Sequence, residues 1–246
     1  MIDENTQERD FIEASFTSFF DQFPEIGKSA HAFYEFYLLL KTWNKKINLV
    51  SDISLHNFVF RHVLDSLFIL KTKILPENPK IVDIGSGAGF PGLSLKIAVT
   101  DIKLISIESI GKKTHFQSDV VEKLSLSDTY IINDRAEAVA RDENCREHAD
   151  LVTARAVASV STLAELALPF VKICGKAVFY KNADIEQELS EGKKAIETCG
   201  GKVSDIIKYR INDDDPERCL LILEKVEATP DKYPRKPGMP AKRPIS

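Results

Sequence analysis

The chain has 246 residues, of which 43% are hydrophobic and 28% are charged. This size and composition are those of one globular domain, with or without an appendage, and they exclude disordered, collagen-like and disulfide-scaffold proteins. Eighteen uninterrupted apolar residues occur nowhere, and the acidic start MIDENTQERD is unlike a secretory signal. We therefore expect a cytoplasmic protein that does not bind membranes.

The chemistry of metal sites and disulfides is not indicated by the sequence. The four cysteines lie far apart, at positions 145, 174, 199 and 219, without a CxxC pair, and the five histidines form no cluster. This spacing is typical of scattered reduced thiols. We expect neither a zinc site nor any other metal site.

The first region, up to residue 79, has the apolar spacing of helices. Pro24 and Gly27 separate the first two predicted helices, and Ser54 is a candidate N-cap for the third. The helices are expected in the segments FIEASFTSFF (11–20), HAFYEFYLLLKTWNKKI (31–47) and SLHNFVFRHVLDSLFILK (54–71). Residues 1–79 are therefore predicted to form a helical segment that packs on the domain that follows.

From residue 80 to residue 228, short β-branched runs alternate with helical stretches, which indicates a mostly parallel sheet covered on both faces. The last two strands are joined by the acidic turn INDDDPE, which leaves no room for a helix, so they should pair antiparallel. Seven strands are expected, at 80–84, 102–107, 129–133, 150–154, 176–181, 202–210 and 218–225. This α/β arrangement resembles the Rossmann-like fold of class I S-adenosylmethionine-dependent methyltransferases.

The first predicted strand runs into the glycine-rich turn IVDIGSGAGFPG, residues 81–92. Gly85, Gly87 and Gly89 would let the backbone turn tightly and let a ligand approach it. The spacing also satisfies the fingerprint of dinucleotide-binding proteins, and a glycine-rich turn without a ligand is a further alternative. The turn alone therefore predicts a nucleotide-like ligand without identifying it.

Two carboxylates bear on the identity of that ligand. Asp83 lies at the end of the strand, where a negative charge suits a cationic amino-acid ligand better than a pyrophosphate. Glu108 ends the second strand, where it could accept both hydroxyls of a ribose, in S-adenosylmethionine and NAD alike. Together with the seven-strand pattern, Asp83 favours S-adenosylmethionine.

The ends of the third and fourth strands are the remaining parts of the expected site. Ala136 and Glu137 follow the third strand, where the adenine is usually held in this fold, and VTARAVAS (152–159) follows the fourth, where the methyl acceptor should lie. That segment lacks the Asn/Asp-Pro-Pro-aromatic run of exocyclic-amine methyltransferases and the cysteine of cytosine C5 enzymes. Arg155 is its notable polar residue, suited to stack on a base, to clamp a phosphate or to form an ordinary salt bridge.

The C-terminal tail, residues 229–246, is basic. Residues 232–246 hold five basic and no acidic side chains, which leaves 28 basic against 37 acidic residues in the first 231, a net charge of −9. Four prolines and a glycine in YPRKPGMPAKRPIS predict an extended arm without a helix, able to follow a phosphate backbone. A solvated, disordered terminus is the alternative.

Seven motifs in order resemble the RsmG family, also called GidB, of bacterial methyltransferases. They are WNKKINLVS (43–51), RHVLDSL (61–67), VDIGSGAGFPGLSL (82–95), ESIGKK (108–113), RAE (135–137), VTARAVAS (152–159) and YPRKPGMPAKRP (233–244). The chain departs mildly from the family pattern at Ser94, where proline is frequent, and in about 20 additional N-terminal residues. The resemblance implies methyl transfer from S-adenosylmethionine to N7 of a guanine in 16S ribosomal RNA of the small subunit.

The resemblance also implies which residues hold the cofactor, namely Gly85, Phe90, Ala136, Glu137 and Arg155. Guanine N7 has a free lone pair, so no general base and no catalytic dyad is expected, and catalysis would come from holding the two reactants in line. The protein is expected to act as a monomer on 16S ribosomal RNA or on the small subunit.

Candidate contacts to RNA lie at both ends of the chain. Arg61 and His62 share a helix face with Asp65, and we expect the first two at the mouth of the site, with Asp65 in a structural network. Arg235 and Lys236 are the candidates in the tail. Three other functions stay open: methyl transfer to another RNA or a small molecule, an NAD(P)-dependent oxidoreductase, and a non-catalytic RNA-binding module.

Overall fold

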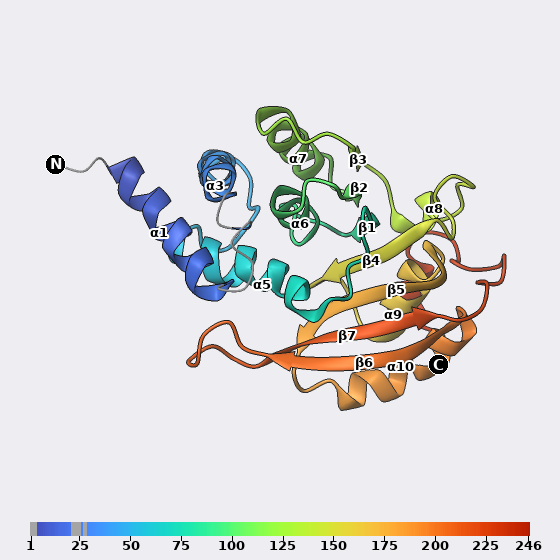
Figure 1. Ribbon diagram of the computed structural model, residues 1–246. Helices are drawn as coiled ribbons and strands as arrows, with labels where there is room; N and C mark the ends of the chain where they lie inside the picture. Colours follow the sequence, from blue (N-terminus) through green and yellow to red (C-terminus); the bar gives the residue numbers. More distant parts are fainter. Residues whose placement is uncertain (1–3, 21–25, 27–28) are drawn as a thin grey trace.

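The structure, a computed structural model, describes residues 4–20, 26 and 29–246. The predicted helix break at Pro24 and Gly27 lies outside these residues. The N-terminal segment is helical, as predicted, and its helices lie together beside the sheet (Figure 1). They are α1 (Glu4–Phe19), α3 (Ala30–Asn44), α4 (Leu55–Asn57), the π-helix η1 (Phe58–Leu64), α5 (Asp65–Leu67) and the 3-10 helix η2 (Phe68–Thr72).

The last helical stretch of this segment is not a regular α-helix. The Ser54 side chain accepts a hydrogen bond from the backbone of Asn57, so the predicted N-cap is confirmed. The chain then continues as the π-helix η1, and π-helical turns are rare and frequently lie at functional sites. Arg61 and His62 both lie in η1.

The predicted seven-stranded sheet is confirmed, with the strand order β3-β2-β1-β4-β5-β7-β6. The first five strands in this order, β3, β2, β1, β4 and β5, run parallel to one another. β7 pairs antiparallel with both β5 and β6. The strands are β1 (Lys80–Ile84), β2 (Lys103–Ile107), β3 (Thr129–Ile132), β4 (Ala149–Arg155), β5 (Val171–Asn182), β6 (Gly201–Tyr209) and β7 (Arg218–Lys225). The order reverses between β1 and β4, and such a switch point is where ligands bind in open α/β sheets.

Alternate side chains of the strands point into two separate hydrophobic cores. Ile81 and Leu151 belong to the core shared with the N-terminal helices, whereas Val82 and Val152 belong to the core on the opposite face. The helices that cover the sheet are α6 (Gly92–Ala98), α7 (Gly111–Lys123), α8 (Ala136–Val139), α9 (Val160–Ala167) and α10 (Glu186–Thr198). In Figure 1, α3, α6 and α7 lie on one side of the sheet and α9 and α10 on the other.

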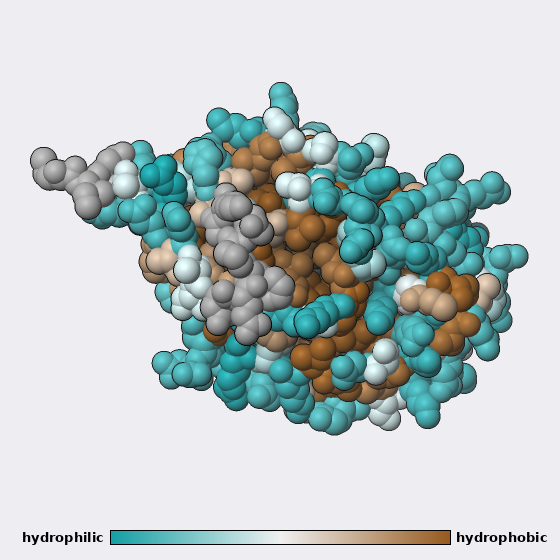
Figure 2. Space-filling model, viewed as in Figure 1, coloured by the Kyte–Doolittle hydropathy of each residue, from teal (hydrophilic) through white to brown (hydrophobic). Residues whose placement is uncertain are grey.

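The N-terminal helical segment is part of the main core rather than an appendage beside it. Buried residues of α1 and α3, such as Phe16 and Phe36, belong to the same apolar cluster as Leu93 of α6 and Phe116 of α7. Figure 2 shows the face of the molecule that is turned to the viewer in Figure 1, with apolar side chains in its middle and hydrophilic ones around them. Among the described residues, no helix combines the length and apolar character that spanning a bilayer requires.

The expectation of a helix-free, extended C-terminal arm is wrong. Residues 239–242 form the short helix α11 (Met239–Lys242), and Pro240 in its first turn is buried. Proline is tolerated there because the first backbone N–H groups of a helix have no partner within it. The tail as a whole follows the surface of the domain, held by hydrogen bonds from Arg141, Arg146 and Ser161 to its carbonyl groups.

Candidate cofactor and acceptor site

The glycine-rich turn between β1 and α6 adopts the backbone conformation that the sequence predicts. Gly85, Gly87 and Gly89 all have positive φ, of 63°, 58° and 86°. A Cβ at Gly85 would lie 2.7 Å from Cγ2 of Val157, so glycine also leaves room for the loop that follows β4. The turn thus brings the ends of β1 and β4 together at the switch point.

Asp83 is buried beneath the turn and supports it there. Its side chain is completely buried, its Oδ2 accepts a hydrogen bond from the Gly92 N–H at 2.9 Å, and its Oδ1 accepts one from the Thr153 hydroxyl at 2.8 Å. Burial raises the pKa of Asp83 to about 7, and the two hydrogen bonds oppose this rise. The carboxyl group therefore joins β1, β4 and the start of α6.

A cavity of about 180 Å³ lies beside the turn, at the carboxyl ends of β1, β2 and β3. Gly85, Glu108, Ala136 and Glu137 line it, so four of the residues expected to hold a cofactor come together there. Asp83, Gly87, Gly89, Phe90 and Arg155 are not among the lining residues. The candidate site therefore has two parts, this cavity and a second group of residues around Arg155.

Glu108 is placed to bind hydroxyl groups while it orders the loops around it. Its two carboxylate oxygens accept hydrogen bonds from the backbone N–H groups of Gly87, at 3.0 Å, and Ile110, at 2.8 Å. A carboxylate oxygen can accept two hydrogen bonds, so each retains one acceptor position for a ligand. The residues present thus fit a ribose with two free hydroxyls at this place.

The side chain of Glu137 has a partner that the sequence did not indicate. Its Oε1 accepts a hydrogen bond from the backbone N–H of Gly238, in the C-terminal tail, at 2.8 Å. Gly238 and Ala241 of the tail also line the cavity, together with Thr162 and Leu166 of α9. These four residues were missed because nothing in the sequence relates them to the glycine-rich turn.

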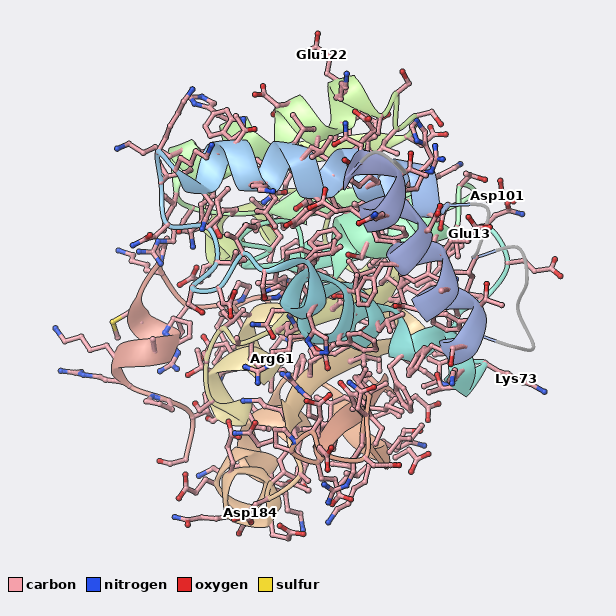
Figure 3. All side chains as sticks on the ribbon, turned by 90° about the vertical axis from the view of Figure 1, so that its left-hand side faces the viewer. Glu13, Arg61, Lys73, Asp101, Glu122 and Asp184 are labelled. Carbon is pink, nitrogen blue, oxygen red and sulfur yellow. The ribbon has the colours of Figure 1, made fainter. Side chains whose placement is uncertain are left out.

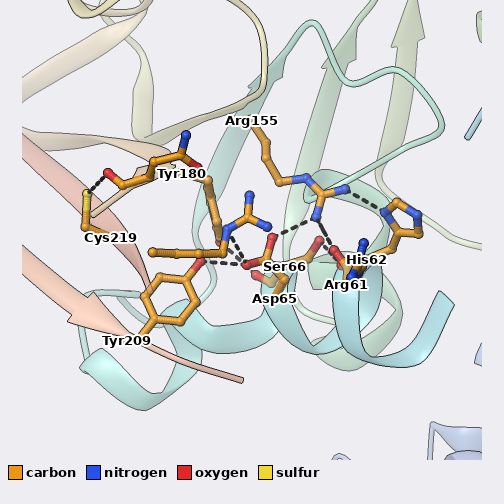
Figure 4. A network of polar contacts seen from close by, with 10 residues as sticks. Arg61, His62, Asp65, Ser66, Arg155, Tyr180, Tyr209 and Cys219 are labelled. Carbon is orange, nitrogen blue, oxygen red and sulfur yellow. Dashed lines mark hydrogen bonds and ion pairs between the residues drawn. The ribbon is translucent and has the colours of Figure 1, made fainter. Parts of the chain in front are cut away.

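Arg155, at the end of β4, lies in a network of polar contacts with the N-terminal segment (Figure 4). Its Nη1 donates to Oδ2 of Asp65 at 2.9 Å, and Nη2 lies 3.2 Å from Nδ1 of His62. Asp65 also accepts a hydrogen bond from the Tyr209 hydroxyl at 2.7 Å and forms an ion pair with Arg218. The expected structural network around Asp65 is thus present, and it includes the arginine of the acceptor segment.

Phe90 and His62 form an aromatic layer next to Arg155. The His62 ring stacks on Phe90 with centroids 5.0 Å apart, and the Arg155 guanidinium lies 5.2 Å from the centre of the Phe90 ring. Burial, together with the positive charges of Arg155, Arg218 and Arg61, lowers the pKa of His62 to about 4. The imidazole is therefore neutral near pH 7, and its Nδ1 accepts from Arg155.

The four candidate RNA contacts have different surroundings. Arg61 is exposed on η1 and points toward the C-terminal half of the molecule in Figure 3, and Lys236 is also exposed. The Arg235 side chain is 27% exposed, and its guanidinium forms an ion pair with Glu165 at 2.6 Å. His62 is half-buried in the aromatic layer. In the described residues, no group of three His, Cys, Asp or Glu side chains is placed to hold a metal ion.

Solved structures with the same fold include methyltransferases. The TYW2 protein of M. jannaschii, solved in complex with AdoMet, matches with a TM-score of 0.51 and 19% identity over 66% of this chain and 77% of that one. A precorrin-6y C5,15-methyltransferase of Geobacter metallireducens matches with a TM-score of 0.50 and 13% identity over 73% of this chain and 91% of that one. These similarities confirm the predicted class I methyltransferase fold.

Relatives with higher sequence identity cover nearly the whole chain. The "Ribosomal RNA small subunit methyltransferase G" of Geobacillus sp. (strain WCH70) is 41% identical over 213 residues, 87% of this chain and 90% of the relative. The protein of the same name from Clostridium tetani is 38% identical over 215 residues, with the same coverage of each chain. The GidB family model, described as "rRNA small subunit methyltransferase G", matches residues 29–216. The chain therefore belongs to the GidB family of rRNA small subunit methyltransferases, as its motifs indicated.

Proposed function

We propose that this protein transfers the methyl group of S-adenosylmethionine to N7 of a guanine in 16S ribosomal RNA. The family supports methylation of small-subunit ribosomal RNA. N7 is the acceptor that the resemblance of the motifs implies, and the absence of the groups that exocyclic-amine and cytosine C5 methylation need agrees with it. We further propose that the enzyme acts as a monomer, in the cytoplasm, and without a metal ion.

The observation that carries the proposal is the arrangement of the two parts of the site around one glycine-rich turn. On one side, Glu108 and the backbone at Ala136 border a cavity, which suits a ribose and a purine. On the other side, Arg155 packs its guanidinium on Phe90 and is held by Asp65, and both side chains are largely buried, so they order the end of β4 beside which the acceptor would bind. We propose that the cofactor binds in the first part and that the acceptor binds beside the end of β4.

The chemistry requires positioning more than proton transfer. Bound S-adenosylmethionine supplies an electrophilic methyl group on a sulfonium ion, and guanine N7 is nucleophilic without losing a proton. His62, neutral and acting as a hydrogen-bond acceptor for Arg155, is not needed as a base in this reaction. Alignment of two bound reactants can lower a barrier by as much as about 7–11 kcal/mol. Arg155 and Phe90 would support that alignment by ordering the end of β4.

RNA must approach from the side where Arg61 is exposed. We assign contact with RNA phosphate groups to Arg61 and Lys236, because both side chains are exposed. Arg235 is bound to Glu165 and His62 to Arg155, so these two residues serve the structure of the site first. N7 lies on the major-groove edge of guanine, so the target base would be unpaired or splayed from its RNA when it enters the site.

The proposal is tested by methyl transfer to ribosomal subunits purified from bacteria that lack their own enzyme of this family. The purified protein and labelled S-adenosylmethionine are incubated with small or with large subunits. We expect label in the small subunit alone, and a loss of at least tenfold in the initial rate for Glu108→Ala. Equal labelling of both subunits, or an unchanged rate for Glu108→Ala, would refute the proposed substrate or the proposed cofactor site, respectively.

A further inference from the structure

The C-terminal tail is bound to the two helices that border the cofactor cavity. Its backbone is fixed at Gly238 by Glu137 of α8, at 2.8 Å, and at Pro240 by the hydroxyl of Thr162 of α9, at 3.3 Å. Gly238 and Ala241 then line the cavity together with Glu108. The tail therefore forms one wall of a site whose other walls come from residues 84–166.

The strongest attachment of the tail is the ion pair between Arg235 and Glu165. Glu165 is completely buried, and its carboxylate accepts four hydrogen bonds from Arg235: one from the backbone N–H at 2.8 Å, two from Nε at 2.9 and 3.1 Å, and one from Nη2 at 2.6 Å. A buried carboxylate needs such a partner to remain charged. This pair fixes the tail three residues before Gly238.

The attachment also determines the conformation of the tail at the cavity. Gly238 has φ of 80°, a conformation that residues with a side chain rarely adopt, and its N–H points at the Glu137 carboxylate. With Gly238 held in this way, α11 begins at Met239 and places Ala241 against the cavity. The Ala241 side chain is a single methyl group, so it borders the cavity without filling it.

We propose that the C-terminal tail is a positioning element of the cofactor site, with Arg235 and Gly238 held by Glu165 and Glu137 so that the tail closes the adenosine side of the cavity. This inference rests on the proposed function, since it takes S-adenosylmethionine as the ligand. It assigns the basic tail a role in cofactor affinity in addition to any contact with RNA. Glu137 then acts through its side chain, by holding the tail.

The test measures the dissociation constant of S-adenosylmethionine by calorimetry, in the absence of RNA. Three variants of the full chain and one truncation are compared: Arg235→Ala, Arg235→Lys, Lys242→Ala and a chain that ends at Tyr233. Lys242 is an exposed lysine of the same tail and serves as the matched control. Circular dichroism and a thermal melt without ligand establish that each variant is folded.

We expect at least a tenfold higher dissociation constant for the truncation and for Arg235→Ala, a smaller increase for Arg235→Lys and no change for Lys242→Ala. The same factors are expected for 5′-methylthioadenosine, which has the nucleoside but not the amino-acid part of the cofactor. If the tail served only the stability of the fold, Arg235→Ala would lower the melting temperature and leave the dissociation constant of the folded variant as it is in Lys242→Ala.

Three results have different consequences. If the intact chain binds S-adenosylmethionine and the folded truncation binds it equally well or more tightly, the inference about the tail is wrong and the proposed function stands. If the intact chain does not bind S-adenosylmethionine, the proposed function fails, and the inference fails with it. If the truncation does not fold, the comparison of Arg235→Ala with Lys242→Ala decides, since an equal dissociation constant in these two variants contradicts the proposal.

Discussion

Replacement of Asp65 by asparagine tests whether the network around Arg155 depends on a buried charge. The Asp65 side chain is 1% exposed and that of Arg155 is 11% exposed, with Nη1 and Oδ2 at 2.9 Å. Asparagine keeps an oxygen for the Tyr209 hydroxyl but removes the charge that faces Arg155 and Arg218. Loss of one partner of a buried ion pair costs about 3–5 kcal/mol, because the other partner stays buried without compensation.

The assay is urea unfolding at pH 7.5, followed by circular dichroism and by the fluorescence of the single tryptophan, Trp43. Glu224→Gln is the matched control, because its ion pair with Lys202 joins side chains that are 31% and 58% exposed, and such pairs contribute about 0–1 kcal/mol. We expect Asp65→Asn to lose at least 2 kcal/mol more than the control. Equal losses in the two variants would refute the conclusion that Asp65 holds a buried cation.

Three further predictions concern stability. Burial raises the pKa of Asp83 to about 7, so the native state binds the proton more tightly than the unfolded chain. The protonated carboxyl group therefore stabilises the fold by about 4 kcal/mol below pH 4, and this stabilisation is lost as the pH rises to 7. In urea titrations, Asp83→Asn should not show this loss of stability. The pKa of His62 is lowered to about 4, so the neutral imidazole stabilises the fold by about 3 kcal/mol above pH 6.5, and this stabilisation is lost as the pH falls toward 4. If the stability of His62→Gln fell with decreasing pH as steeply as that of the unaltered protein, this assignment would be contradicted. Gly89 has φ of 86°, and an added Cβ would overlap the Leu93 side chain, so Gly89→Ala should lose about 1–3 kcal/mol of stability. A Cβ at Gly111 would lie 3.2 Å from Oδ1 of Asn133, so Gly111→Ala should lose less in the same titration.

The sheet could be predicted from the sequence because its signals are local. The run KIVDI before the glycines and the hairpin that ends at residue 225 have β-branched residues and turn signals next to one another. The resemblance of seven motifs then identified the family, and the cavity contains Gly85, Glu108, Ala136 and Glu137 as expected. These residues lie at strand ends, and the topology of a parallel sheet brings strand ends together.

The remaining features depend on contacts between distant parts of the chain. Arg235 meets Glu165 across 70 residues, and Arg155 meets Asp65 across 90, so neither pairing is visible in local spacing. Prolines in the tail suggested an extended arm, but hydrogen bonds from distant side chains overrode that local preference. The sequence gives the position of Asp83 at the strand end, but not its complete burial beneath the turn, which depends on the packing of β4 and α6 around it.

The chemical identity of the methylated nucleotide tests the central claim most directly. Small subunits labelled by the purified protein are extracted, and their RNA is treated so that the chain breaks at 7-methylguanine. We expect one break, at a single guanine of 16S ribosomal RNA, with a yield that follows the incorporated label. Label without such a break, or label on another position of the base, would contradict the proposal that guanine N7 is the acceptor.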